Sequence, residues 1–424
     1  MKNVFILIFF FLLINCSNKK NLEFDIDDLK KDGKIILESK KANLEDDLLV
    51  NKIQKIKLYS TDLTENKKKF DLKFSILKSE NFSEYMKNNY FKKYILNHDN
   101  KIIFIDDESN LFIIDTNFKV LSKFQIYKKK EYKKFILKFS LLVKNNILYV
   151  STNLGKILAF DINKNSILWS NDLNVPFLSN IVSYKDSIFS TNANGKLYSF
   201  DMLSGKQNWS YETGTASIKS TNAFKINLKD NILIFSNDLG NIYFINLDSR
   251  NVLASYQVPQ STEMTQNNLF EITNFVLEDI NLYFASSYGK IIKINIVNGT
   301  EVWTNELISN LKLIVNPETI ISINERGFIN IFDKKSGAIL FKKNLIKIIS
   351  NDKLKVKNSK LNNIFIFLNY ILVTTNDGYL ISINSANLND INVKKISNEV
   401  KSNVILYNNN LFFIGEKNFI YRVL

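Results

Sequence analysis

Residues 194–209, which read NGKLYSFDMLSGKQNW, decide the fold. Apolar and polar residues alternate before and after Gly195, and this alternation is typical of half-buried β-strands. Glycine adopts a positive φ without steric cost, so Gly195 predicts a tight hairpin between two strands. The unit ends at Trp209, fourteen residues after the turn glycine.

The same unit occurs eight times along the chain, so the sequence is an internal repeat. The copies cover residues 100–115, 146–161, 186–201, 231–246, 280–295, 318–333, 369–384 and, in truncated form, 409–424. Successive turn residues are 38 to 51 positions apart, which fits four strands and variable loops per unit. These turn residues are Ser109, Gly155, Gly195, Gly240, Gly289, Gly327, Gly378 and Asn418.

All three tryptophans of the chain occupy one position of the repeat. Trp169, Trp209 and Trp303 each lie fourteen residues after a turn residue, and Phe341 has this position in a fourth copy. Repeats of four short strands without helical periodicity predict an all-β fold, an eight-bladed β-propeller of four-stranded antiparallel blades. We expect the aromatic ring to cover the neighbouring sheet. A parallel β-helix fits less well, because its repeats are shorter and more uniform.

The last copy ends before the aromatic position, so its outermost strand is missing. We expect an N-terminal strand to supply it and so to close the ring, which removes two open sheet edges. The preferred segment is residues 67–77, with Phe70 in the aromatic position. The alternative is residues 55–64, with Tyr59 in that role.

The N-terminus has the features of an export signal. Lys2 is followed by an apolar run from Val4 to Ile14 and by the only cysteine, Cys16. The run is too short to span a bilayer as a helix, but it suits a signal peptide. The residues LINC at 13–16 resemble a bacterial lipobox, although Asn15 stands where Gly, Ala or Ser is usual.

The lipobox resemblance implies an acylated Cys16 and a lipid anchor. The serine after the cysteine implies the outer membrane, so we expect a periplasmic protein held on that membrane. The predicted segments are a signal peptide at 1–15, a lipidated N-terminus and tether at 16–66, and the propeller at 67–424.

Composition argues against several kinds of site. One Cys and one His cannot build a disulfide framework, a Cys/His zinc site or a Cys–His nucleophile. No supporting constellation surrounds His98, and no Asp-x-Asp-x-Asn-Gly calcium loop occurs. The net charge of +14 comes from scattered lysines, including a run at 127–134, which favours solvated surface over nucleic-acid binding.

The pattern Gly-x-Leu-Tyr-x-Phe-Asp-x-x-x-Gly-x-x-x-Trp at 195–209 resembles the repeat of pyrroloquinoline-quinone-type propellers. The resemblance covers about residues 67–424. With the lipobox and eight blades, the chain is similar to the BamB family of outer-membrane assembly lipoproteins. The resemblance implies no enzyme activity, no cofactor, no catalytic residue and no metal. The implied partners are BamA and other subunits of the β-barrel assembly (BAM) complex, with one copy of the chain in the hetero-complex.

The resemblance also implies a BamA-binding site on two loops. Family members carry Leu-x-Leu-Arg after the tryptophan of an early-middle blade, and Ala216, Ile218 and Lys219 stand in these places. The family's acidic pair before a later strand corresponds to Glu271 and Thr273, so one acid is retained. We expect Lys219 and Glu271 to pair across the two loops. The polar loop 255–273 is a further candidate contact segment.

Two other functions remain open from the sequence. A quinoprotein dehydrogenase would bind its cofactor in the central channel, although a site disulfide of adjacent cysteines is impossible here. A ligand-binding propeller would need an exposed aromatic platform, and the tryptophans are assigned to the repeat.

Overall fold

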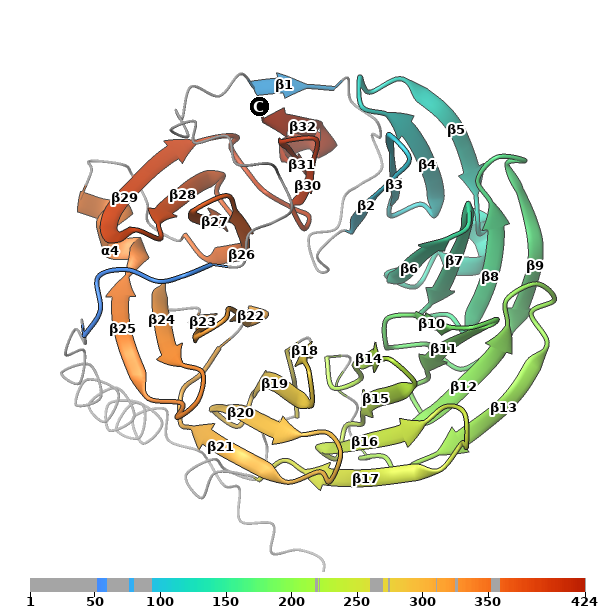
Figure 1. The fold of residues 1–424 in the computed structure, drawn as a ribbon. Helices are drawn as coiled ribbons and strands as arrows, with labels where there is room; N and C mark the ends of the chain where they lie inside the picture. Colours follow the sequence, from blue (N-terminus) through green and yellow to red (C-terminus); the bar gives the residue numbers. More distant parts are fainter. Residues whose placement is uncertain are drawn as a thin grey trace, which may run out of the picture. The chain divides into compact units, whose positions relative to one another are not determined.

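A computed structural model describes residues 52–58, 76–79, 94–217, 220, 222–259, 270–273, 275–309, 311–324, 327–351 and 359–423. These residues all belong to one compact unit, Val50–Leu424. Within this unit, eight four-stranded antiparallel sheets follow one another around a ring (Figure 1). The eight-bladed all-β propeller predicted from the repeat is confirmed.

In each of the first seven blades the chain runs from the innermost strand to the outermost strand (Figure 1). The first four blades comprise β2 (Ile95–His98), β3 (Lys101–Ile105), β4 (Asn110–Asp115) and β5 (Val120–Gln125); β6 (Phe139–Lys144), β7 (Ile147–Thr152), β8 (Lys156–Asp161) and β9 (Ser166–Asp172); β10 (Val182–Tyr184), β11 (Ser187–Thr191), β12 (Lys196–Asp201) and β13 (Gln207–Glu212); and β14 (Ile226–Lys229), β15 (Ile232–Ser236), β16 (Asn241–Asn246) and β17 (Val252–Gln257).

The next three blades follow the same order. They comprise β18 (Val276–Glu278), β19 (Asn281–Ser286), β20 (Lys290–Asn295) and β21 (Glu301–Asn305); β22 (Ile314–Val315), β23 (Thr319–Ile323), β24 (Phe328–Asp333) and β25 (Ile339–Asn344); and β26 (Leu361–Phe367), β27 (Tyr370–Thr375), β28 (Tyr379–Asn384) and β29 (Asn387–Lys395).

The eighth blade joins the two ends of the propeller. Its strands β30 (Ile405–Tyr407), β31 (Asn410–Ile414) and β32 (Ile420–Val423) are completed by β1 (Ile76–Lys78), which pairs antiparallel with β32. The Ser79 amide donates to the Ile420 carbonyl, and the Ile420 amide donates to Ser79 Oγ, both at 2.9 Å. An N-terminal strand therefore closes the ring, as predicted.

The closing strand lies at the end of the preferred segment 67–77 and extends one residue beyond it. Leu77 pairs with Arg422, which lies four residues after the turn residue Asn418. In the third blade, Trp209 pairs in the same way with Ser199, four residues after the turn residue Gly195. Leu77 thus holds the place of the aromatic residue in this blade, while Phe70 lies outside the described residues.

Residues 52–58, part of the segment predicted as tether, lie along other blades. The Lys52 amide donates to Leu340 O in β25, and the Ile56 amide donates to Ser385 O beside β29. Ile53, Ile56 and Leu58 pack against the hydrophobic cluster of these blades. Residues 55–58 of the alternative closing segment are therefore engaged elsewhere, and Tyr59 lies outside the described residues.

The eight turn residues of the repeat share one backbone conformation, with φ between +62° and +93°. An L side chain is strained there, which explains why six of the eight are glycine and the others are serine and asparagine. Gly378 is the most restricted, because an added Cβ would lie 2.1 Å from the Ser397 carbonyl oxygen. The backbone conformation of these turns thus explains why the repeat has glycine, serine or asparagine at the turn position.

Aromatic side chains at the repeat position connect neighbouring blades. The Trp169 ring covers Gly205 of the next blade, and Trp169 Nε1 donates to the Met202 carbonyl at 2.9 Å. Trp303 repeats this arrangement, with its ring against Gly337 and Nε1 donating to Lys334 O at 3.2 Å. Each tryptophan therefore secures the outer turn of the following blade.

The other two aromatic residues at this position act differently. Phe341 is 1% exposed and belongs to the core cluster between its blade and the next. Trp209 is partly buried, and the centroid of its ring lies 5.7 Å from the centroid of the Phe189 ring. The Trp169 and Trp303 rings each pack on a glycine of the next blade. In the blade that follows Trp209, the corresponding residue is Arg250, which also has a positive φ.

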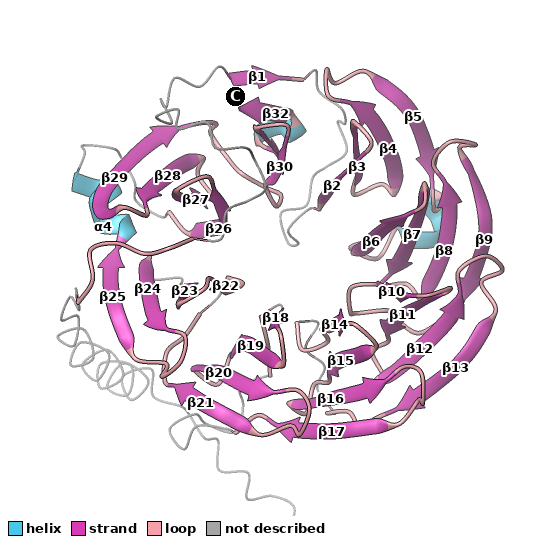
Figure 2. Cartoon of the chain, viewed as in Figure 1, coloured by secondary structure: helices cyan, strands magenta, loops and turns pink. Residues whose placement is uncertain are grey.

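Among the residues that the structure describes, short helices interrupt the strands at three places (Figure 2). They are α3 (Lys129–Tyr132), α4 (Leu345–Asn351) and the 3-10 helix η1 (Glu416–Asn418). Buried Tyr127 and Tyr132 anchor α3, while the lysines of the run at 127–134 are exposed. Among the described residues, no helix has the length and apolarity needed to cross a membrane.

Candidate functional site

The candidate partner-binding residues lie on one end of the ring, which we call the link face. In an antiparallel blade, the turn between the second and third strands lies at the same end as the link from the outermost strand to the next blade. Hydrogen bonds join them: the Thr213 amide donates to Gly195 O, and the Val258 amide donates to Gly240 O. The link face therefore combines the eight repeat turns with the links between blades.

The link between β13 and β14 contains Ala216, which is partly buried. Its amide donates to Asp238 Oδ1 at 3.0 Å, so a carboxylate from the β15–β16 turn fixes this part of the link. Asp238 is 5% exposed. Ile218 and Lys219, the other candidate residues of this link, lie outside the described residues.

The link before β18 brings Glu271 to the same place. Glu271 Oε1 accepts from Ser220 Oγ at 3.4 Å and from Asn222 Nδ2 at 3.3 Å. The Ile272 amide donates to Asn222 O at 3.3 Å, so backbone also connects the two links. Glu271 thus contacts residues 49 and 51 positions away in the sequence. The residues of the two links and of the turn that fixes the first link are called the two-link site: Ala216, Ser220, Asn222, Asp238, Glu271 and Thr273.

Thr273 has a structural role in this site. Its amide donates to Ala285 O at 2.8 Å, and its Oγ1 accepts from the Ala285 amide at 2.9 Å. The hydroxyl therefore holds the link against β19. Glu271 is exposed and supplies the negative charge of the surface.

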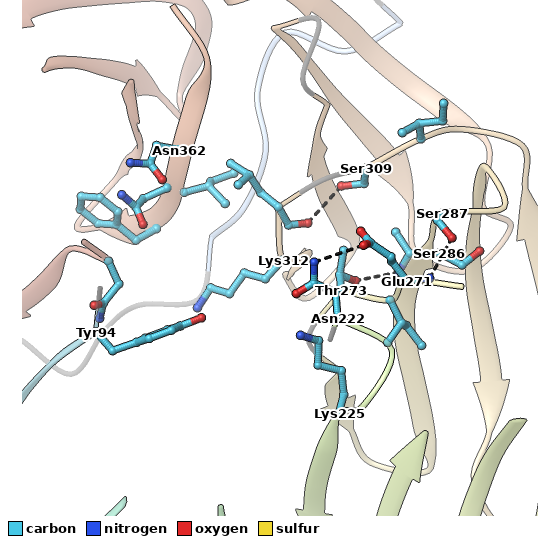
Figure 3. A pocket seen from close by; sticks show the side chains of 18 of the residues that line it. Tyr94, Asn222, Lys225, Glu271, Thr273, Ser286, Ser287, Ser309, Lys312 and Asn362 are labelled. Carbon is cyan, nitrogen blue, oxygen red and sulfur yellow. Dashed lines mark hydrogen bonds between the residues drawn. The ribbon is translucent and has the colours of Figure 1, made fainter. Parts of the chain in front are cut away.

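A cavity opens at the centre of the ring beside the two-link site (Figure 3). It is described by two adjoining volumes of about 620 and 750 Å³ that share Tyr94, Lys225 and Lys312. Glu271 and Thr273 line the first volume, and Lys138 lines the second. Lys225, Lys312 and Tyr94 come from three different links and point toward the same space (Figure 3).

The pKa of Lys225 is lowered to about 8, mainly by burial and also by the positive charge of Lys138, while Glu271 opposes the shift. Burial also lowers the pKa of Lys138, again opposed by Glu271. The two ammonium groups thus repel each other in a partly dehydrated place. The cavity mouth is electropositive, and Glu271 compensates it only in part.

We expect Lys225→Gln to raise the melting temperature at pH 7. In the folded protein the charged lysine is disfavoured, whereas in the unfolded chain its pKa is near 10.4. The unfolded state then binds more protons between about pH 8 and 10.4, so the stability of the unmodified protein rises with pH there. The difference in melting temperature between Lys225→Gln and the unmodified protein should therefore shrink as the pH rises over this window. Thermal unfolding at pH 7 to 10 measures it, with exposed Lys119→Gln as a control that should show no such trend.

Three aspartates and His98, which lie outside these two places, make hydrogen bonds that stabilise turns or strand ends. Asp161, Asp201 and Asp333 each accept backbone amides of the following turn, which is a structural role. Hydrogen bonds from Ser204 lower the pKa of Asp201. His98 is hydrogen-bonded to Asn146 at 2.8 Å in a turn region. In the part of the chain that the structure describes, no three His, Cys, Asp or Glu side chains cluster as metal ligands would.

Sequence reasoning missed Asp238, Ser220 and Asn222 of the two-link site and the three lysines of the cavity. The sequence does contain a signal for the lysines. Lys225 follows Lys138 by 87 residues and Lys312 follows Lys225 by 87 residues, which is about two repeats each time. Comparing the residues that precede each innermost strand would have brought these positions together.

The repeat, the eight blades and the interblade tryptophans define a propeller of the pyrroloquinoline-quinone-repeat type. The chain belongs to the BamB family: residues 131–343, half of its length, match the family described as outer membrane protein assembly factor BamB. An uncharacterized protein of Rickettsia conorii is 24% identical over 381 residues, which cover 86% of this chain and 80% of that protein.

Two solved structures illustrate the fold. BamB from Moraxella catarrhalis has a TM-score of 0.64 and 17% identity, covering 78% of this chain and 95% of that one. The quinohemoprotein alcohol dehydrogenase from Comamonas testosteroni has a TM-score of 0.61 and 8% identity, covering 83% and 76%. These identities establish a shared fold and no more.

Proposed function

We propose that the protein is a non-catalytic scaffold lipoprotein of the BAM complex that binds BamA and assists the insertion of outer-membrane proteins. The observation that carries the proposal is the family match, which spans residues 131–343 and so includes every residue of the two-link site. Acylation of Cys16 would hold the propeller on the periplasmic side of the outer membrane. The ring itself supplies a rigid support for binding loops.

The two-link site is the proposed BamA contact. Glu271 is exposed and is held by Ser220 and Asn222, and Asp238 fixes the link at Ala216. The surface therefore offers one oriented carboxylate, and Ile218 and Lys219 belong to one of its two links in the sequence. A basic and apolar patch on the partner would complement it.

We expect Glu271→Lys and Ile218→Asp each to weaken binding of the soluble BamA domains by about tenfold or more, because interface contacts of this kind contribute 1–3 kcal/mol. Biolayer interferometry with purified proteins measures the change. Glu318→Lys makes the same charge change at the exposed turn between β22 and β23, at the other end of the ring, and should bind normally. Undiminished binding by both variants would remove this site.

A quinoprotein-like dehydrogenase is the second candidate, because the propeller fold is shared with the Comamonas enzyme and a central cavity is present. It requires stoichiometric quinone binding and dye-linked alcohol oxidation. An absorption spectrum of the purified protein, before and after incubation with pyrroloquinoline quinone and calcium, distinguishes the two. A bound quinone chromophore with turnover would contradict the scaffold proposal.

A further inference from the structure

Apolar side chains that are not fully buried form part of the walls of the central cavity. Side chains of the innermost strands line the larger volume and are half-buried, where solvated positions would ordinarily be polar. Six of them are Leu96, Leu141, Leu228, Leu277, Ile314 and Val315. Apolar surface that faces an open cavity indicates a place for an apolar ligand.

The mouth of the same cavity is cationic. Lys138, Lys225 and Lys312 line it from three links, and Lys229 lies on the wall. Glu271 is the single carboxylate among the described residues that line the cavity, and it is already hydrogen-bonded to Ser220 and Asn222. Positive charge thus exceeds negative charge where apolar walls begin.

We propose that the central cavity binds an amphiphilic anion, with a carboxylate or phosphate head among Lys138, Lys225 and Lys312 and an apolar chain along the innermost strands. Ammonium groups that repel one another gain most from an anion placed between them. Each of the two volumes, about 620 and 750 Å³, is of the size that proteins use for small ligands, roughly 300–1,000 Å³.

Calorimetric titration of the full chain with dodecanoate and with dodecyl phosphate, below their micelle concentrations, tests the proposal. We expect saturable binding of one molecule of at least one of them, and the two arms separate a carboxylate from a phosphate head. Dodecanol and dodecyltrimethylammonium should bind at least tenfold more weakly. Butyrate and inorganic phosphate should also bind weakly, since each buried methylene adds about fourfold in affinity.

Variants separate the head site from the walls. Lys138→Gln and Lys225→Gln should each weaken binding about tenfold or more, since each removes a charged partner. Glu271→Gln should strengthen binding, because it removes the one opposing carboxylate, and Lys119→Gln should have no effect. Leu228→Ser should weaken the binding of dodecanoate more than the binding of butyrate. Melting curves of every variant show whether it remains folded.

Proton uptake gives an independent measurement. At pH 9 the unliganded Lys225 is mostly neutral, and a bound anion favours its charged form, so binding should take up protons there and not at pH 6.5. Titrations in buffers of different ionisation enthalpy detect the uptake, which should disappear in Lys225→Gln. No binding, binding of neutral and cationic amphiphiles equal to that of the anions, or binding unaffected by both lysine variants would each overturn the proposal.

Discussion

Replacing residues 76–79 by Pro-Gly-Gly-Pro should destabilise the propeller by about 3–5 kcal/mol, because the pairing of β1 with β32 and the two Ser79 bonds are lost together. The replacement leaves β32 as an open edge, where buried Tyr421 and Val423 become accessible. Open edges pair with other chains, so we also expect oligomers. Urea unfolding and size-exclusion chromatography measure the two effects.

A matched replacement makes this result specific to ring closure. The same Pro-Gly-Gly-Pro sequence at residues 52–55 removes the Lys52 amide bond to Leu340 O and the Ile53 contact but opens no blade edge. This replacement should lower the free energy of unfolding clearly less and leave the protein monomeric. Equal losses for the two replacements would contradict closure by β1.

Trp169→Ala should destabilise the protein by about 3–5 kcal/mol, as for a large aromatic side chain removed from a core. The ring is 9% exposed, covers Gly205, and its Nε1 donates to Met202 O. Gly205→Ala should cost about 2–4 kcal/mol, because its Cβ would lie 2.4 Å from the indole and the residue has a φ of +71°. Urea unfolding of both variants measures these costs.

The double variant Trp169→Ala/Gly205→Ala separates the clash from the backbone strain. Once the indole is absent, Gly205→Ala should cost only the strain of about 1–2 kcal/mol, so the two changes are strongly non-additive. Gly214→Ala is the control, because its Cβ meets only a Leu239 methyl group at 3.1 Å and the backbone is unrestricted. Additive costs would show that the tryptophan and the glycine of the next blade do not interact.

The parts of the fold that the sequence predicted are those where one residue type is physically required. Positive φ at the repeat turns restricts them to glycine and short polar residues, so periodicity revealed all eight blades. The missing last strand also followed from the repeat. Its register did not, because the three residues of β1 are exposed and Ser79, rather than a buried aromatic, fixes the end of the pairing.

The short helices and the sites were harder to predict. α3 has four residues, too few for a helical period, and two buried tyrosines hold it in place. The cavity lysines are three among 56 Lys and Arg residues, and only the ring brings them together. In the two-link site, the sequence indicated Glu271, whereas Asp238 depended on a turn that folds back on another link.

Affinity purification of the unmodified, tagged protein from solubilised membranes, with quantitative identification of the bound proteins, tests the scaffold function most directly. We expect to find the protein in the outer-membrane fraction and to recover BamA and other BAM subunits with it in near-stoichiometric amounts. Release of the protein as a soluble species without any BAM subunit would contradict it.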